Sequence, residues 1–122
     1  NVSCVGWKSH QELLEYYSSA DVMIIPSRWE GFGLVAIEAM SCKLPVIAAR
    51  VGGLAEIIVD NETGRLFDRN SAEKLRKIIQ DITYDDIKSM SVNSFERVKN
   101  LYDINRLNNE ITTLYDRLIR NA

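Results

Sequence analysis

The sequence predicts an α/β fold, a Rossmann-like parallel sheet with helices on both faces that ends in a helical tail. Two short, uncharged apolar runs, Val22–Ile25 and Val46–Ala49, are typical of buried parallel strands. A segment rich in helix formers lies between them, and strand–helix–strand units pack as right-handed crossovers. From residue 70 onward the apolar residues recur at helical spacing. We therefore expect an α/β core over residues 1–69 and a helical tail over residues 70–122.

The amino-terminal segment predicts a short strand and a helix. We expect Val2–Val5 to form the strand. Ser9 then begins a helix that runs to about Ser18, because Glu12 stands three residues later and completes a capping box. This helix should turn Leu13, Leu14 and Tyr17 toward the core. We interpret His10, in the first turn of the helix, as a solvated surface residue.

Glycines, prolines and polar turns divide the middle of the chain. Pro26 ends the strand Val22–Ile25, because proline has no N–H to give to a neighbouring strand. The elements that we expect after it are a helix over Leu34–Cys42, the strand Val46–Ala49, a helix that contains Glu56–Val59, a polar turn over Asp60–Gly64 and an edge strand over Arg65–Phe67.

The tail predicts three helices. Asn70 is expected to cap the first, over Ser71–Ile82, with Glu73 at the capping-box position. The second covers Asp85–Leu101 and the third covers Asn105–Arg120. The side chains expected to face the core are Leu75, Ile78, Ile79 and Ile82 from the first helix and Ile87, Met90, Phe95 and Val98 from the second.

The segment Pro26–Ala39 carries the chemistry that we expect of this chain. A loop with Gly31 and Gly33 follows a strand and leads into a helix, which gathers free backbone N–H groups at the positive end of a helix dipole. Such a place suits a phosphate. Glu30 precedes both glycines, and Glu38 lies eight residues later in the helix. Because a phosphate repels a carboxylate, the two acids are better suited to accept hydrogen bonds from sugar hydroxyls on either side.

This segment and the residues after it resemble a known family. Pro26–Ala39 is followed by Ser41–Ala48, which contains Pro-Val-Ile-Ala, and by Val51–Ile58, which contains Gly-Gly and then a glutamate. Together they resemble the Glu-x7-Glu region of family 4 retaining glycosyltransferases with the GT-B fold, over roughly Val5–Leu66, about half of the chain. One departure is Lys43, where the family usually has glycine. A positive φ at this position would cost lysine about 1 kcal/mol.

The resemblance implies a site and a reaction. Glu30 would bind hydroxyls of the donor sugar as the catalytic residue, and Glu38 would bind the ribose of the nucleotide. The backbone of the turn between them, which would meet the sugar and the diphosphate, consists of Gly31, Phe32, Gly33 and Leu34. The implied reaction moves a sugar from a nucleoside diphosphate donor to an acceptor hydroxyl with retention at the anomeric carbon. The family typically needs no metal and no other cofactor.

Gly52 and Gly53 follow a strand, as the Glu30–Gly33 loop does, so both loops should face one cleft at the carboxyl ends of the strands. The two glycines either form a tight turn into the next helix or let backbone approach the donor or acceptor. Trp7 and Trp29 stand near this cleft in the sequence. We interpret both as packing residues rather than as platforms for a base.

The chain of 122 residues is too short for the two Rossmann-like domains of a GT-B enzyme. We expect the carboxyl-terminal half of such an enzyme, with the missing amino-terminal domain as its partner. In enzymes that it resembles, the final helix crosses toward that domain. The final helix here carries a narrow apolar stripe made of Ile104, Leu107, Ile111, Leu114 and Leu118. We interpret the stripe as packing on its own domain, and a bare stripe buried by self-association is the alternative.

Composition and charge narrow the range of partners. A net charge of −2 and a pI near 5.4 predict no nucleic-acid partner. The apolar runs are too short to span a membrane. We expect a cytoplasmic protein, either free or peripheral to the inner face of the membrane. No residue points to a membrane-bound acceptor. Cys4 and Cys42 are expected to be buried, reduced thiols, and a single His with no Cys-x-x-Cys predicts no metal site.

Two other functions remain open at this point. One is a nucleotide-sugar epimerase on the same scaffold, which its product would distinguish from a transferase. The other is a non-catalytic interaction subunit, which loss of Glu30 or Glu38 would favour, although both residues are present. The sequence does not specify the sugar, the base or the acceptor.

Overall fold

A parallel sheet forms the centre of the fold. The computed structural model describes residues 1–120. Its strands are β1 (Met23–Ile25), β2 (Val46–Ala49) and β3 (Gly64–Phe67), in the order β1-β2-β3. Both pairings are parallel, and the register places Ile25 beside Ala48 and Ala49 beside Phe67. The predicted core strands are therefore confirmed to within one residue, and all three end at the same edge of the sheet.

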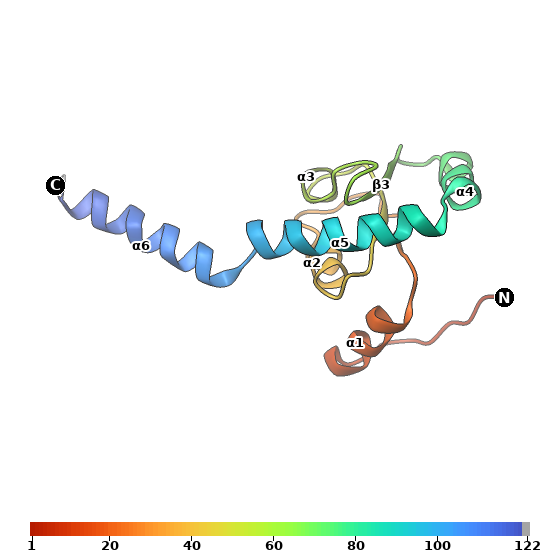
Figure 1. Cartoon of the computed structure of the whole chain (residues 1–122), viewed down its shortest axis with the longest axis horizontal. Helices are drawn as coiled ribbons and strands as arrows, with labels where there is room; N and C mark the ends of the chain where they lie inside the picture. Colours follow the sequence, from red (N-terminus) through yellow and green to blue (C-terminus); the bar gives the residue numbers. More distant parts are fainter. Residues whose placement is uncertain (121–122) are drawn as a thin grey trace.

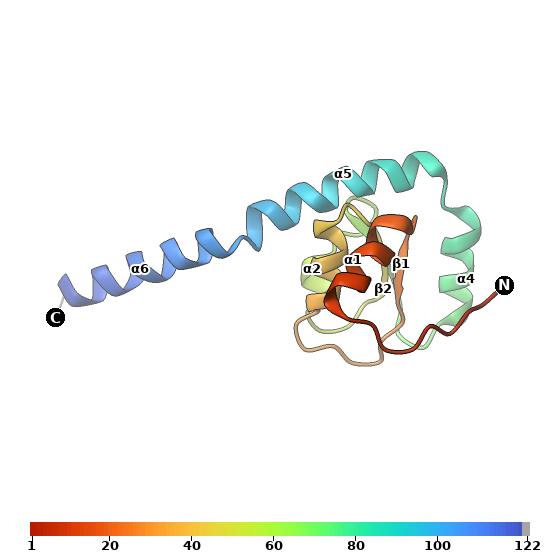
Figure 2. The same cartoon turned by 90° about the horizontal axis from the view of Figure 1, so that it is seen from below.

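Helices cover both faces of the sheet. They are α1 (His10–Ser19), α2 (Leu34–Ser41), α3 (Leu54–Ile57), α4 (Ala72–Asp81), α5 (Tyr84–Leu101) and α6 (Ile104–Arg120). Val46 and Ala48 pack in one core with residues of α1, α2, α3 and α5, whereas Ile47 and Ala49 pack with α4. In Figures 1 and 2, α2 and α4 accordingly lie on opposite sides of the strands. The predicted α/β class with helices on both faces is confirmed.

Capping boxes fix where α1 and α5 begin. Ser9 and Glu12 form the predicted box of α1, in which the backbone N–H of Ser9 donates to Glu12 Oε2 over 2.9 Å. This hydrogen bond to the backbone is the largest cause that lowers the pKa of Glu12 below its ordinary value. Thr83 and Asp86 form a second box, which our prediction lacked. Helix α5 therefore begins at Tyr84 rather than one residue later.

The predicted start of α4 is wrong. Ser71 is the N-cap, and its side chain accepts a hydrogen bond from the backbone N–H of Lys74 over 3.3 Å. Asn70 instead adopts a left-handed φ of 66°, which asparagine tolerates better than most residues. With the cap moved by one position, Glu73 does not complete a capping box and forms an ion pair with Arg76.

Of the eleven core positions predicted on α1, α4 and α5, four are buried, namely Tyr17, Ile78, Met90 and Val98, and six are partly buried. Ile79 is an error, because its side chain is 48% exposed. Ile79 lies about 100° around α4 from Ile78 and therefore turns away from the sheet. His10 is exposed, as predicted. The helix predicted to contain Glu56–Val59 is wrong at its end, because the single turn of α3 ends at Ile57.

Lys43 follows α2 in a left-handed conformation, with φ of 60°. Glycine is favoured at this place after a helix, which explains why lysine is a departure from the family pattern. Two contacts with α5 hold the residue. The Lys43 carbonyl accepts a hydrogen bond from Ser91 Oγ over 2.7 Å, and the ammonium lies 5.2 Å from the centre of the Phe95 ring. These contacts offset part of the strain of the positive φ.

The amino-terminal segment differs from its prediction. Residues 1–7 are exposed and have no regular secondary structure, so the strand predicted at Val2–Val5 is wrong. No strand within residues 1–120 pairs with this segment, and an unpaired strand leaves its backbone groups to water. Cys4 is consequently exposed, against the prediction of a buried thiol, while Cys42 is partly buried, and both are free. Trp7 is 88% exposed, so its interpretation as a packing residue is also wrong.

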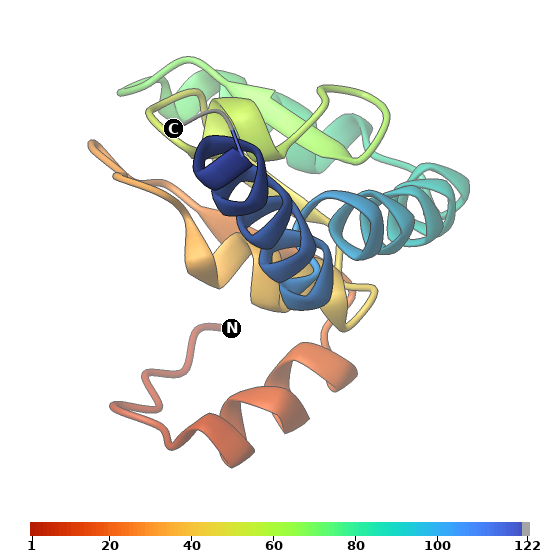
Figure 3. The same ribbon diagram turned by 90° about the vertical axis from the view of Figure 1, so that its left-hand side faces the viewer.

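Helix α6 extends away from the rest of the domain (Figure 1). Figure 3, in which α6 faces the viewer, shows that α5 lies behind it while α1 lies well to one side. The residues of the apolar stripe, which are between 42% and 61% exposed, are Ile104, Leu107, Ile111, Leu114 and Leu118. The interpretation that this stripe packs on its own domain is therefore wrong for residues 1–120. No helix within residues 1–120, α6 included, is both long enough and apolar enough to cross a membrane.

Candidate functional site

The loop between β1 and α2 runs across the carboxyl edge of the sheet and reaches α2 through Gly33. Gly33 is the N-cap of α2 and has a φ of 94°, a conformation that favours glycine. A Cβ at this position would lie 3.0 Å from Ile57 Cδ1 and 3.2 Å from Leu54 Cδ2. Both the backbone conformation and the space beside α3 therefore require glycine at the start of this helix.

Gly52 and Gly53 support the same loop from the end of β2. A Cβ on Gly52 would lie 1.8 Å from the carbonyl oxygen of Glu30, and a Cβ on Gly53 would lie 2.0 Å from that of Phe32. Neither distance is possible for a real side chain. The two loops thus pack backbone against backbone, so the glycines hold the Glu30–Phe32 segment in place. Whether they also approach a ligand stays a prediction.

The amides of the turn that leads into α2 make no hydrogen bond within residues 1–120. Ala36 and Ile37 donate to the Gly33 carbonyl over 3.0 and 3.3 Å, which are the first hydrogen bonds of the helix. In residues 1–120 the N–H groups of Phe32, Gly33 and Leu34 have no acceptor. Because they stand at the positive end of the α2 dipole, they form a place where an anion is stabilised. This row of amides is called the cradle below.

Glu30 lies in the loop before the cradle and is partly exposed. Its carboxylate makes no hydrogen bond or ion pair within the described part of the chain, although its carbonyl packs on Gly52. A carboxylate in this condition can accept hydrogen bonds from a ligand without first releasing a protein partner. The structure therefore leaves Glu30 available on the same loop as the cradle.

Glu38 lies in the second turn of α2 and is partly buried. Tyr17 of α1 donates a hydrogen bond from its hydroxyl to Glu38 Oε2 over 3.3 Å. The side chain of Tyr17 is buried, and this burial raises the pKa of Tyr17, with the negative charge of Glu38 as the second cause. Glu38 Oε1 has no partner in residues 1–120. Tyr17 was predicted only as a core residue, and no local spacing pattern could connect it to Glu38, 21 residues away.

An apolar groove of about 300 Å³ is lined in part by Phe32 and Leu34 of the cradle. Its other walls come from α2 and from the junction of α5 and α6, and they include Ile37, Tyr102 and Leu107. The rings of Phe32 and Tyr102 meet edge to face, with their centres 6.3 Å apart. Tyr102, which our prediction did not include, therefore packs against a side chain of the cradle itself.

Trp29, beside Glu30, is 81% exposed, so its interpretation as a packing residue is wrong.

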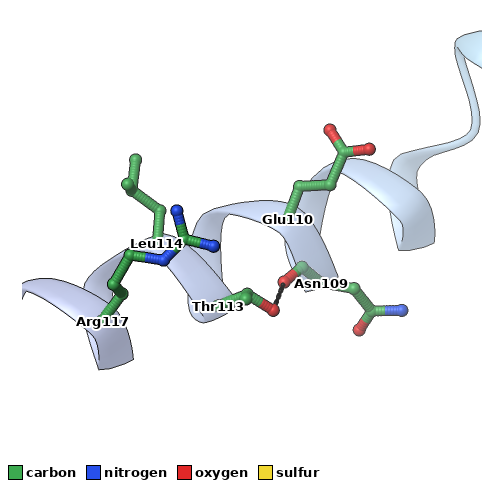
Figure 4. A pocket seen from close by; sticks show the side chains of 5 residues that line it. All are labelled: Asn109, Glu110, Thr113, Leu114 and Arg117. Carbon is green, nitrogen blue, oxygen red and sulfur yellow. Dashed lines mark hydrogen bonds between the residues drawn. The ribbon is translucent and has the colours of Figure 1, made fainter.

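A shallow hollow on α6 is lined by Asn109, Glu110, Thr113, Leu114 and Arg117 (Figure 4). Its lining comes from one helix, and the only hydrogen bond drawn there runs from the Thr113 hydroxyl to the Asn109 carbonyl within that helix. Within residues 1–120 no other element faces this hollow, and its polar side chains do not converge on one point.

Metal ligands do not gather at the cradle. Within residues 1–120 no group of three His, Cys, Asp or Glu side chains is placed to hold a metal ion. The charge of an anion at the cradle would be met by amides and by the α2 dipole.

Comparison with known proteins identifies the family of the chain. Residues 1–101 match the family described as glycosyl transferases group 1. The chain is 39% identical over 89 residues to an uncharacterized glycosyltransferase of Methanocaldococcus jannaschii, a match that covers 72% of this chain and 25% of that protein. It is 47% identical over 75 residues to a D-inositol 3-phosphate glycosyltransferase of Arthrobacter sp., covering 62% of this chain and 18% of that protein.

Solved structures show the same likeness. The fold superimposes on a sucrose-phosphate synthase from Thermosynechococcus elongatus with a TM-score of 0.84 and 38% identity, over 99% of this chain and 31% of that one. It also matches the carboxyl-terminal domain of a glycosyl transferase group 1 protein from Francisella tularensis, with a TM-score of 0.67 and 34% identity, over 84% of this chain and 53% of that one. The chain spans about a quarter of the length of the first curated relative named above, 25%.

Proposed function

The chain belongs to the glycosyl transferases group 1 family, and on that premise we propose that it forms the donor-binding half of a glycosyltransferase. The donor is a nucleoside diphosphate sugar, and the sugar passes to an acceptor hydroxyl with retention at the anomeric carbon. The relatives named above are glycosyltransferases and a synthase, so the alternatives of an epimerase or a non-catalytic subunit are not favoured.

The observation that carries the proposal is the cradle. Three successive amides of the Phe32–Leu34 turn lack an acceptor in residues 1–120, and they stand at the positive end of α2. Leaving several N–H groups unpaired in a protein is unfavourable unless water or a ligand satisfies them. A diphosphate offers several oxygens with negative charge, which matches both the number of donors and the sign of the helix dipole.

The two glutamates extend the site on either side of the diphosphate. Glu30 has no protein partner in residues 1–120 and would accept hydrogen bonds from hydroxyls of the donor sugar. Glu38 has one oxygen held by Tyr17 and the other without a partner in the described chain, and it would bind the ribose hydroxyls. A ligand that buries one of these carboxylates without offering it a hydroxyl loses about 1–3 kcal/mol of binding free energy. Both glutamates therefore also select for sugars.

The chemistry follows from the placement of these charges. When the bond between the anomeric carbon and the diphosphate breaks, the electron pair leaves with the diphosphate, whose negative charge grows. Amides and a dipole that already point at this group stabilise the transition state more than the ground state. Glu30, on the sugar side of the cradle, orients the ring whose carbon is attacked by the acceptor hydroxyl.

The complete site includes an amino-terminal half, as the limited coverage of the relatives suggests. We propose that this half supplies most contacts with the acceptor and packs on the apolar stripe of α6. Where it is absent, self-association of the chain would cover the same stripe. We propose a cytoplasmic enzyme whose acceptor is either free or held at the inner face of a membrane.

The test is a substitution in the polypeptide that carries both halves. Glu30→Ala should lower kcat/KM for sugar transfer by about tenfold or more, because the donor sugar loses its fixed acceptor. Glu15→Ala is the matched control, since Glu15 is exposed on α1 and makes no contact with the loop. An unchanged rate for Glu30→Ala would remove Glu30 from the site. The anomeric configuration of the product, read by NMR, tests retention separately.

A further inference from the structure

Two arginines line a hollow at the carboxyl edge of the sheet. Arg28 lies in the loop after β1, and Arg69 lies in the loop after β3. The hollow has a volume of about 470 Å³, and its lining consists of Arg28, Arg69 and Asn70. Arg69 Nη1 donates a hydrogen bond to the Arg28 carbonyl over 3.4 Å, which connects the two loops. The sheet therefore brings the Arg69 guanidinium to the backbone of Arg28, 41 residues away in sequence, and both residues line the hollow.

Neither guanidinium has an acidic partner among the described residues. In residues 1–120 no carboxylate lies within 4.0 Å of Arg28 or Arg69, whereas Arg50, Arg76 and Arg106 each have an acidic partner. Asp68, the acid next to Arg69, forms its ion pair with Lys74 instead. Two like charges that share a hollow without a counter-charge create a positive potential there. Such a place attracts an anion.

The hollow also contains a neutral donor. Asn70 is held with a positive φ at the end of the β3 loop, and its side-chain amide makes no hydrogen bond in the described chain. The amide can donate two hydrogen bonds, and each guanidinium can donate two in parallel to one oxyanion. A phosphate monoester carries nearly two negative charges at neutral pH, which balances two arginines better than a carboxylate would.

We propose that Arg28 and Arg69 bind the phosphate of a sugar phosphate that serves as the acceptor. The assignment rests on the proposed function, because it takes the cradle as the site of the donor diphosphate. Arg28 precedes Glu30 by two residues and the cradle by four, so one loop carries both Arg28 and the glutamate that we assign to the donor sugar. An anion bound there holds the acceptor next to the sugar that is transferred.

The experiment is an NMR titration of the 122-residue chain with glucose 6-phosphate, with UDP present to fill the cradle. The amides of Arg28, Arg69 and Asn70 should shift, and neutral glucose should not shift them. The double variant Arg28→Ala with Arg69→Ala should bind glucose 6-phosphate about tenfold more weakly or worse, because two charge-assisted contacts are lost. Arg76→Ala is the matched control and should bind normally, since Arg76 pairs with Glu73 on α4.

Three results would overturn the proposal. One is an absence of glucose 6-phosphate binding, another is an equal loss of binding in Arg76→Ala, and the third is a set of shifts confined to the cradle. Arg28→Lys with Arg69→Lys keeps the charge but removes the parallel donors, and it should bind with intermediate affinity. The nucleotide step is scored by itself: UDP binding without sugar phosphate binding rejects only this inference, whereas cradle amides that stay unchanged with UDP, GDP and ADP alike reject the proposed function.

Discussion

The Tyr17 hydroxyl donates a hydrogen bond to Glu38 Oε2 over 3.3 Å and thereby connects α1 to α2. Burial raises the pKa of Tyr17, and the charge of Glu38 raises it further, so the hydroxyl keeps its proton at neutral pH. The contact fixes one oxygen of Glu38 and leaves the other without a partner in residues 1–120. Tyr17 is therefore a positioning residue for the glutamate that we assign to the ribose.

Tyr17→Phe should weaken binding of a nucleoside diphosphate by roughly three- to tenfold, the usual value of one such hydrogen bond. Calorimetric titration with UDP measures the effect. Tyr16→Phe is the control, because the Tyr16 side chain is 43% exposed and makes no contact with Glu38. Equal affinities for Tyr17→Phe and the unaltered chain would show that the orientation of Glu38 does not depend on this hydroxyl.

The same contact predicts a pH dependence of stability. The folded-state pKa of Tyr17 is raised above the ordinary value of 10.0, so the folded state holds the proton more tightly than the unfolded state. Its stabilising contribution is complete below about pH 10 and is lost as pH rises through the folded-state pKa. Urea unfolding at a series of alkaline pH values should therefore show a smaller decline for Tyr17→Phe. An identical decline would contradict the assignment.

Gly53→Ala should displace the Glu30–Phe32 loop, because the new Cβ would lie 2.0 Å from the Phe32 carbonyl oxygen. We expect a loss of about 2 kcal/mol in the free energy of unfolding, as for other overpacked sites. Gly31→Ala is the control, since its Cβ would meet only Trp29 at 3.5 Å. Chemical denaturation of both variants tests this, and equal stabilities would show that the two loops do not support one another.

Lys43 offers a test of backbone strain. Lys43→Gly and Lys43→Ala both remove the contact of the ammonium with the Phe95 ring, but only glycine relieves the φ of 60°. Lys43→Gly should therefore be more stable than Lys43→Ala by about 1 kcal/mol. Thermal or urea unfolding of the pair measures the difference. If alanine proves as stable as glycine, the left-handed conformation carries no cost at this position.

The apolar stripe of α6 should drive self-association of the chain when no amino-terminal half is present. Ile111→Asp with Leu114→Asp should shift the chain toward the monomer, because the charges lie in the middle of the stripe. Asn109→Asp with Thr112→Asp adds the same charge outside the stripe and should leave the association unchanged. Sedimentation at several concentrations distinguishes the variants. A chain that is monomeric throughout would contradict this part of the account.

The sequence predicted the fold class because its signals are local. The apolar runs around Ile25 and Val46 are short and uncharged, and Pro26 and the glycines mark their ends, so the strands were found to within one residue. The predictions were wrong where contacts with distant parts of the chain determine the local structure. Val2–Val5 has strand composition but no neighbouring strand in residues 1–120, and Asn70 has the chemistry of a cap but a left-handed backbone.

The candidate site also combines features that are local in sequence with contacts that only the folded chain makes. The order of Glu30, the glycines and Glu38 could be read along the chain, because the cradle is one continuous segment. The contact of Tyr17 with Glu38 and the pairing of Arg28 with Arg69 could not, since each joins loops or helices that only the packed sheet brings together.

The most direct test of the account is an NMR titration of the 122-residue chain with UDP, GDP and ADP. The account predicts that one of these nucleotides shifts the amides of Phe32, Gly33 and Leu34 far more than those of α4, and that Glu38→Ala weakens its binding. Amides of Phe32–Leu34 that stay unchanged at saturating concentrations of all three nucleotides would contradict the assignment of this turn as the diphosphate site.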